Sequence, residues 1–171
     1  MPVIKRVFLF AAATFFAHTS QAQSEISRDG EGQKVIKGFL TRDQLASDTA
    51  FKWFSANQKD YKPYAPALQS LTAQKDSVQF LVFAGTWCHD TQFILPKFYA
   101  LASAAGIPDA RISTVGVDVA KKSQHNLTEV FRVENVPTII VLKNGKEAGR
   151  VVEYGKSGMF EKDLGEIVKG K

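Results

Sequence analysis

The chain has 171 residues, of which 44% are hydrophobic and 23% are charged, and it carries a formal net charge of +5. This charge is mild and the lysines are scattered, so no nucleic-acid partner is expected. Cys88 is the single cysteine, which excludes an internal disulfide. Its side chain is therefore a small buried apolar group, a partner in an intermolecular bond, or a reactive thiol.

The first 22 residues have the pattern of a secretory signal peptide. A basic start at Lys5 is followed by an apolar run over 7–17 and by a small-x-small pattern that ends at Ala22. The apolar run is well short of the ~20 residues that a membrane span needs. We therefore predict cleavage after Ala22, a periplasmic or secreted protein, and no membrane span after cleavage.

The segment after the predicted cleavage point divides into a polar part and a structured part. Residues 23–33 are polar and contain glycine, which predicts a flexible leader. Residues 34–77 are expected to supply the N-terminal strand and helices of the domain. Within them, Thr41 and Gln44 have the spacing of a capping box and predict a helix start.

Residues 78–171 have clearer periodicity and are predicted to form the core of the domain. Four segments are expected to be a buried strand, a helix, a second buried strand and a short helix, in the order 78–85, 94–105, 111–118 and 127–131. Two apolar runs then flank Asn144-Gly145, a strong hairpin signal, and a last helix follows. This order predicts a mixed sheet with helices on both faces.

Cys88 lies where the first of these strands gives way to a helix. The first turn of a helix presents unpaired N–H groups and the positive end of the helix dipole. Both features stabilise a thiolate over a thiol, and reactive cysteines occupy such positions. The position of Cys88 therefore makes it a candidate nucleophile.

Several short motifs follow one another in an order that is typical of one family. They are Trp87-Cys88-x-x-Thr91, then Pro96, then Val136-Pro137-Thr138, and finally Lys143-Asn144-Gly145. Together they resemble the thioredoxin superfamily over about residues 78–168. The resemblance implies an α/β fold, a thioredoxin-like three-layer α/β/α sandwich with a mixed central sheet, here with an N-terminal extension.

In that family, the first active-site cysteine attacks a disulfide and a second one, three residues later, resolves the product. Cys88 matches the first position, whereas Thr91 matches the second and cannot resolve a mixed disulfide. The Thr91 hydroxyl could still donate a hydrogen bond to the sulfur and favour the thiolate. The resemblance therefore implies a monothiol site that needs an external resolving thiol, with protein or low-molecular-weight thiols and disulfides as partners.

Further site residues are implied by the same resemblance. Pro137 matches the cis proline of the family, so Trp87, Val136 and Pro137 are expected to line a substrate groove. His89 and Asp90 lie between the two key positions: a protonated His89 would favour the thiolate and an ionised Asp90 would oppose it. Alternatively, this pair faces solvent at the helix start.

Two functions of different classes follow. The first is an exported thiol-disulfide oxidoreductase that acts through Cys88, and the second is a non-catalytic binding or chaperone-like module whose groove holds a peptide or client protein. The lack of a second cysteine, and Val82 at the position where thioredoxins commonly carry a buried carboxylate, favour the second. The Trp87-Cys88 pair, Pro137 and the hydroxyl of Thr91 favour the first, which is the function we expect. No metal site or cofactor is expected, because the histidines and Cys88 lack ligand spacing. A monomer or a Cys88-linked dimer is expected.

Overall fold

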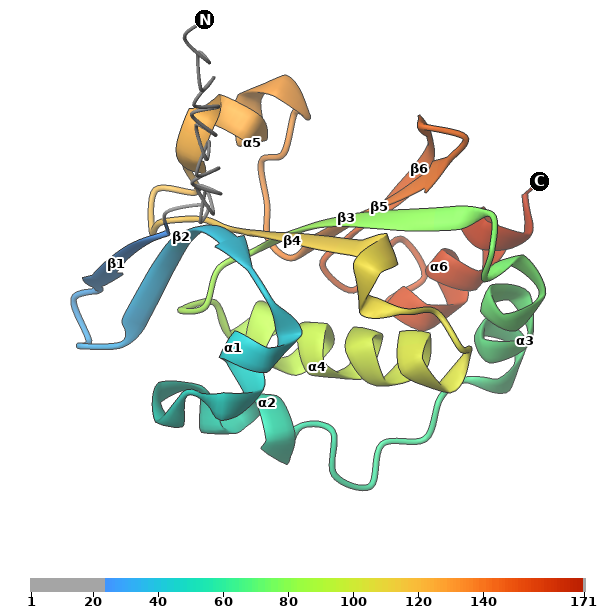
Figure 1. Cartoon of the computed structure of the whole chain (residues 1–171), viewed down its shortest axis with the longest axis horizontal. Helices are drawn as coiled ribbons and strands as arrows, with labels where there is room; N and C mark the ends of the chain where they lie inside the picture. The colour runs from blue at the N-terminus through green and yellow to red at the C-terminus, as the bar shows by residue number, and fades with distance from the viewer. Residues whose placement is uncertain (1–23, 171) are drawn as a thin grey trace, which may run out of the picture.

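A six-stranded mixed sheet organises the protein (Figure 1). This computed structural model describes residues 24–170, so the predicted signal peptide, residues 1–22, lies outside the described residues. The strands are β1 (Glu25–Arg28), β2 (Lys34–Leu40), β3 (Val78–Ala84), β4 (Ile112–Gly116), β5 (Thr138–Lys143) and β6 (Lys146–Val152). Their order across the sheet is β1-β2-β4-β3-β5-β6, and β3 with β4 is the parallel pair.

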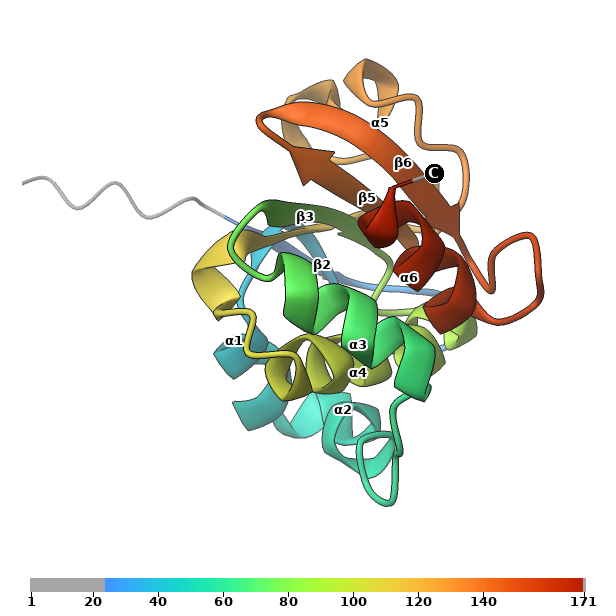
Figure 2. The same ribbon diagram turned by 90° about the vertical axis from the view of Figure 1, so that its right-hand side faces the viewer.

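The helices flank this sheet unequally. They are α1 (Arg42–Ser47), α2 (Lys52–Ala56), α3 (Ala65–Gln74), α4 (His89–Ala104), α5 (Leu127–Val130) and α6 (Phe160–Lys169). Figures 1 and 2 show α5 on one face and the other five on the opposite face. Within residues 24–170, no helix combines the length and the apolar character that crossing a membrane requires. The expected α/β fold with helices on both faces is confirmed, with most of the helical cover on one side.

The side chains of β3 point alternately to the two faces of the sheet and belong to two separate apolar clusters. Phe80 and Val82 point into the larger cluster, where α4 and α6 contribute Phe98 and Leu164. Phe83 points to the other face, into a smaller cluster that the α5 region covers. Because successive residues of a strand face opposite sides, one continuous apolar strand supports both layers.

Most predicted elements are confirmed. The Thr41 and Gln44 side chains form the predicted capping box at the start of α1. Asn144 and Gly145 both have positive φ values, 50° and 73°, as the tight turn of the β5–β6 hairpin requires.

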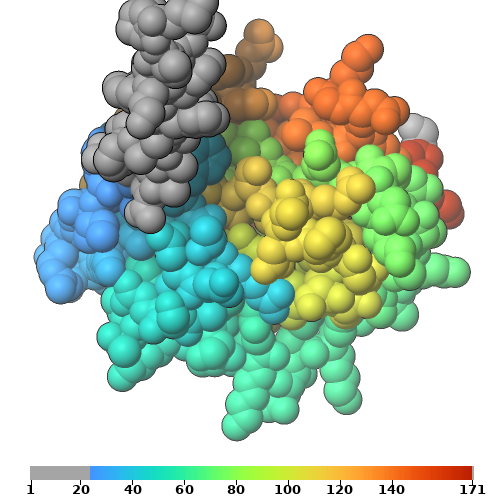
Figure 3. Space-filling view, in the orientation of Figure 1, coloured from blue at the N-terminus to red at the C-terminus, as the bar shows by residue number. Residues whose placement is uncertain are grey.

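The prediction of a flexible leader over 23–33 is wrong for its central part. Residues 25–28 form β1, which pairs in antiparallel register with β2. All four β1 side chains are exposed, so backbone hydrogen bonds hold this edge strand and no apolar alternation marks it in the sequence. In the space-filling view, the N-terminal segments, coloured blue to teal, lie beside the yellow residues that follow α4 (Figure 3).

The β2 and β4 backbones approach each other closely at a pair of glycines. Gly38 of β2 is the register partner of Gly116 of β4. A Cβ atom on Gly116 would overlap the carbonyl oxygen of Ile36. Glycine at position 116 is therefore what lets the N-terminal hairpin join the central sheet.

The proline inside α4 leaves one helix carbonyl without its usual N–H donor, and a side chain at the C-terminal end of α2 donates to that carbonyl instead. Pro96 has no N–H to donate to the carbonyl of Gln92, one turn earlier. Asn57 Nδ2 donates to that oxygen instead, at 3.0 Å. This bond helps to hold α2 against the first half of α4, the helix whose N-cap residue is Cys88.

Candidate functional site

Cys88 is the N-cap residue of α4, at the end of the loop that follows β3. Its backbone N–H donates to the Gly85 carbonyl at 2.9 Å, and its own carbonyl accepts the Gln92 N–H at 2.9 Å. The side chain is half-buried, and its Sγ lies 3.3 Å from the carbonyl oxygen of Val136. The thiol thus sits at the positive end of a helix and is partly exposed to solvent.

The Val136–Pro137 peptide bond is cis and lies beside the cysteine. The Pro137 carbonyl accepts the Glu153 N–H at 2.7 Å, and Thr138 Oγ1 donates to the Asn135 carbonyl at 2.6 Å. Val136 itself is buried. The structure therefore brings Val136 and Pro137, far along the chain, to the Cys88 sulfur.

Thr91 has a different contact from the one expected. Its buried Oγ1 accepts the Gly85 backbone N–H at 3.2 Å. Within the described part of the chain, the expected hydrogen bond from Thr91 to the Cys88 sulfur is not formed. Because Thr91 lies one turn into α4, its hydroxyl faces back into the β3–α4 loop and fixes that loop rather than the thiol.

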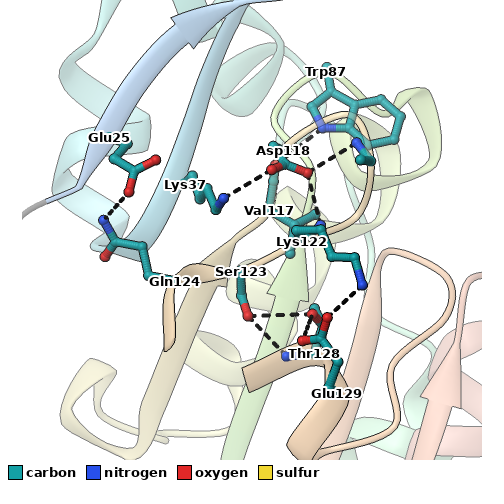
Figure 4. A network of polar contacts seen from close by, with 11 residues as sticks. Glu25, Lys37, Trp87, Val117, Asp118, Lys122, Ser123, Gln124, Thr128 and Glu129 are labelled. Atoms are coloured by element: carbon teal, nitrogen blue, oxygen red, sulfur yellow. Dashed lines mark hydrogen bonds and ion pairs between the residues drawn. The ribbon is translucent and has the colours of Figure 1, made fainter. Parts of the chain in front are cut away.

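Trp87 is anchored by a long-range hydrogen bond. Its Nε1 donates to the Val117 carbonyl, just after β4, at 3.2 Å (Figure 4). The indole lies over Gly85, where a Cβ atom would come within 2.8 Å of the ring. Trp87 and Cys88 both pack against the smaller apolar cluster. The ring therefore has a fixed place in the loop that carries Cys88.

The residues around the thiol add a tyrosine that the sequence did not indicate. His89 is exposed and Asp90 is half-buried. Burial raises the pKa of Tyr154, and the nearby Asp90 carboxylate raises it further. Tyr154 lies in the loop after β6, which carries no motif, so only the folded chain places it near Asp90. Val82 is fully buried in the larger cluster, so β3 brings no carboxylate to the site there.

Comparison with known proteins identifies the family. The thioredoxin family model matches residues 64–165. The chain belongs to the thioredoxin family. It is 34% identical over 79 residues to a thioredoxin of Echinococcus granulosus, a match that covers 46% of this chain and 68% of the relative. It is 31% identical over 90 residues to an H-type thioredoxin of Fagopyrum esculentum, covering 52% and 72% of the two chains.

A solved structure supports the same thioredoxin fold. A Pseudomonas aeruginosa protein of unknown function superposes with a TM-score of 0.54 at 15% sequence identity, covering 77% of this chain and 90% of that one. At that identity, the likeness concerns the fold alone. The predicted resemblance to the thioredoxin superfamily is thus confirmed at the level of family and fold.

The loop that anchors Trp87 in this thioredoxin-family site is organised by one carboxylate. Asp118 Oδ1 accepts the N–H groups of Ala120 at 3.0 Å and Lys122 at 2.9 Å. Its Oδ2 pairs with Lys37 of β2 at 3.0 Å (Figure 4). Burial alone would raise the pKa of Asp118, but these N–H and ammonium partners outweigh it and lower the pKa.

This lowered pKa predicts an acid-dependent loss of stability. A carboxylate whose folded pKa lies below the unfolded value of about 3.9 stabilises the fold above that value, and the contribution is lost as the pH falls through the folded pKa. Asp118→Asn should cost about 1 kcal/mol of unfolding free energy between pH 5 and 7. The cost should shrink below about pH 4. Urea denaturation across this range measures it, and a cost that is constant down to pH 3 would contradict the assignment.

The N-terminal hairpin of this thioredoxin-family chain is bonded to both sides of the cysteine. Thr86, two residues before Cys88, donates to the Lys34 carbonyl at 2.8 Å and accepts the Ile36 N–H at 3.3 Å. Gln92, four residues after it, donates to Gln33 Oε1 at 3.1 Å. Sequence reasoning missed this arrangement, because the hydrogen bonds join residues 50 to 59 positions apart.

Proposed function

We propose that the protein is an exported thiol-disulfide oxidoreductase that acts through Cys88 alone. The observation that carries the proposal is a half-buried thiol at the start of α4, 3.3 Å from the carbonyl that precedes a cis proline. Membership of the thioredoxin family supports the redox role. Export is proposed from the signal-like pattern of residues 1–22, with the periplasm as the expected compartment.

The chemistry proposed is a two-step exchange. The Cys88 thiolate attacks one sulfur of a partner disulfide, forms a mixed disulfide and releases the other sulfur as a thiolate, which takes up a proton. An external thiolate then attacks the partner's sulfur in the mixed disulfide and releases Cys88 as a thiolate. One disulfide is consumed and one is formed, so no separate oxidant or reductant is needed.

The surroundings of Cys88 suit each part of this exchange. Cys88 is the N-cap of α4, and the N-terminus of a helix is the end that interacts favourably with negative charge. Trp87, Val136 and Pro137 would flank a partner chain that approaches the sulfur. Thr91 offers a hydroxyl that is already bonded to Gly85, so the resolving thiol has to come from outside.

The test follows the mixed disulfide directly. The purified protein is incubated with oxidised glutathione and analysed by intact mass, and the adduct is then challenged with reduced glutathione. We expect one glutathionyl group per chain, added faster than to an unfolded peptide containing Trp-Cys-His-Asp, stable until the external thiol is added and released afterwards. Cys88→Ser should take up no adduct.

In about 0.5 M salt, where charge effects are screened, a rate no faster than that of the unfolded peptide would contradict the proposal. The alternative is the non-catalytic module, in which the same groove holds a peptide or client protein. The hydrogen bond from the Cys88 thiol to the Val136 carbonyl is the feature that would suit a resting, unreactive cysteine.

A further inference from the structure

The turn that joins β1 to β2 forms one side of the hollow at Cys88. Residues 29–33 of this turn are called the hairpin wall here. The hollow is lined by Trp87, Cys88, His89 and Asp90 from the start of α4 and by Asp29, Gly30, Glu31 and Gln33 from the hairpin wall. A partner that reaches the sulfur from this side therefore meets two segments that are far apart in the sequence.

The hairpin wall has a defined shape. Asp29 Oδ1 accepts the N–H groups of Glu31 at 2.9 Å and Gln33 at 2.8 Å, which closes the turn around one carboxylate. The Gln33 amide donates to Glu31 at 3.1 Å and accepts from Gln92 of α4 at 3.1 Å. Because Gln92 also donates to the Thr86 carbonyl at 3.0 Å, the hairpin wall and the Cys88 loop are tied to the same side chain.

The charges around the hollow are mostly of one sign. Three carboxylates, those of Asp29, Glu31 and Asp90, are among its lining residues, and His89 is the one lining residue that can become cationic. Arg28 donates to the Gly32 carbonyl at 2.7 Å but is not a lining residue. Charges of one sign that line a concave surface raise the local concentration of partners of the opposite sign.

From this arrangement we infer that the hairpin wall selects partner disulfides or thiols that carry positive charge next to the reacting sulfur. The inference rests on the proposed function of Cys88 and specifies its partner class. Glu31 is the main specificity-determining residue, because its side chain is exposed and lines the same hollow as Cys88, while only its backbone N–H bonds to the Asp29 carboxylate that closes the turn. Basic residues flanking a partner cysteine would be attracted, and acidic ones repelled.

The test compares two methanethiosulfonate reagents of opposite charge, one with a trimethylammonium group and one with a sulfonate. The Cys88 thiolate attacks the reagent's sulfenyl sulfur, forms a mixed disulfide and releases methanesulfinate. The ratio of the two rates is divided by the same ratio for the protein unfolded in urea. We expect a normalised ratio of about ten at low ionic strength, falling towards one in about 0.5 M salt.

The matched variant is Glu31→Gln, which removes the charge but keeps an oxygen for Gln33. It should lower the normalised ratio about threefold. Glu166→Gln on α6, whose side chain does not line this hollow, is the control and should leave the ratio at the wild-type value. A wild-type ratio near one, or a Glu31→Gln ratio equal to that of wild type in the folded protein, would overturn the inference.

Failure of this inference and failure of the proposed function have different signatures. The reagents modify any accessible thiol, so the ratio reports the charge around Cys88 whether or not the protein exchanges disulfides. Oxidised glutathione is anionic, so its transfer is compared in about 0.5 M salt, where charge repulsion is screened. A high ratio at low salt without glutathionyl transfer at high salt would support the hairpin wall and contradict the oxidoreductase. Glutathionyl transfer with a ratio near one would support the oxidoreductase and contradict the charge selection by the hairpin wall.

Discussion

Thr91→Cys should convert the externally resolved site proposed above into a self-resolving one. In the wild-type protein, the adduct at Cys88 has no neighbouring thiol, since Thr91 offers only a hydroxyl. A cysteine three residues after Cys88 would attack the mixed disulfide within the same chain. Intramolecular attack gains a large effective concentration, so the lifetime of the glutathionyl adduct should fall by at least about 100-fold. Intact mass against time, without added thiol, measures this.

Two further substitutions separate the chemistry of position 91 from its structural role. Thr91→Ser keeps the hydroxyl that accepts the Gly85 N–H, and Thr91→Val removes it. Neither supplies a thiol, so both should retain a long-lived adduct, although Thr91→Val should lose about 1 kcal/mol or more of stability because a buried N–H is left unpaired. A Thr91→Cys adduct as durable as that of Thr91→Ser, in folded protein, would show that position 91 cannot reach the sulfur.

Gly116→Ala should be among the most destabilising small substitutions in the chain. The added Cβ would overlap the Ile36 carbonyl oxygen, which is backbone and cannot rotate away. Relieving the overlap requires β2 to move off β4, against the hydrogen bonds of their ladder. We expect a loss of about 3 kcal/mol and a melting temperature lower by about 10 °C. Urea and thermal unfolding followed by circular dichroism give both values.

Gly30→Ala is the matched control for this substitution. Gly30 also belongs to the N-terminal hairpin, but a Cβ there has no atom within 4 Å. Its φ is not in the left-handed region, so alanine fits without strain. The change should stay within about 0.5 kcal/mol of wild type. Comparable losses of unfolding free energy in the two variants would mean that steric overlap between β2 and β4 does not explain the loss in Gly116→Ala.

The elements with a strong local signal were predictable from the sequence. The apolar run that became β3, the Asn144-Gly145 turn and the Thr41–Gln44 capping box depend on neighbouring residues, and each was confirmed. The strand β1 was missed because its side chains are all exposed. Its position depends on pairing with β2, which no pattern within residues 25–28 encodes.

In the candidate site, too, the features that depend on neighbouring residues were predictable and the contacts between distant segments were not. The strand-to-helix junction at Cys88 and the Val136–Pro137 segment follow from short motifs and from the family resemblance. The contacts that decide how Cys88 is surrounded are long-range: Thr91 turns to Gly85, Tyr154 arrives from the loop after β6, and Gln33 reaches Gln92. Hydrogen bonds between distant segments have no periodic signature, so sequence reasoning assigned the residues but not their partners.

The bond from Thr86 to β2 also bears on how much chain a member of this family needs. The family model begins at residue 64, after β2, α1 and α2. Yet β2 and α1 supply Ile36, Leu40 and Leu45 to the larger cluster, and β2 covers the edge of β4. A chain that began at residue 64 would expose that strand edge and leave Thr86 without its backbone partners. The stretch that matches the family model and the stretch that builds the larger cluster are therefore different parts of this polypeptide.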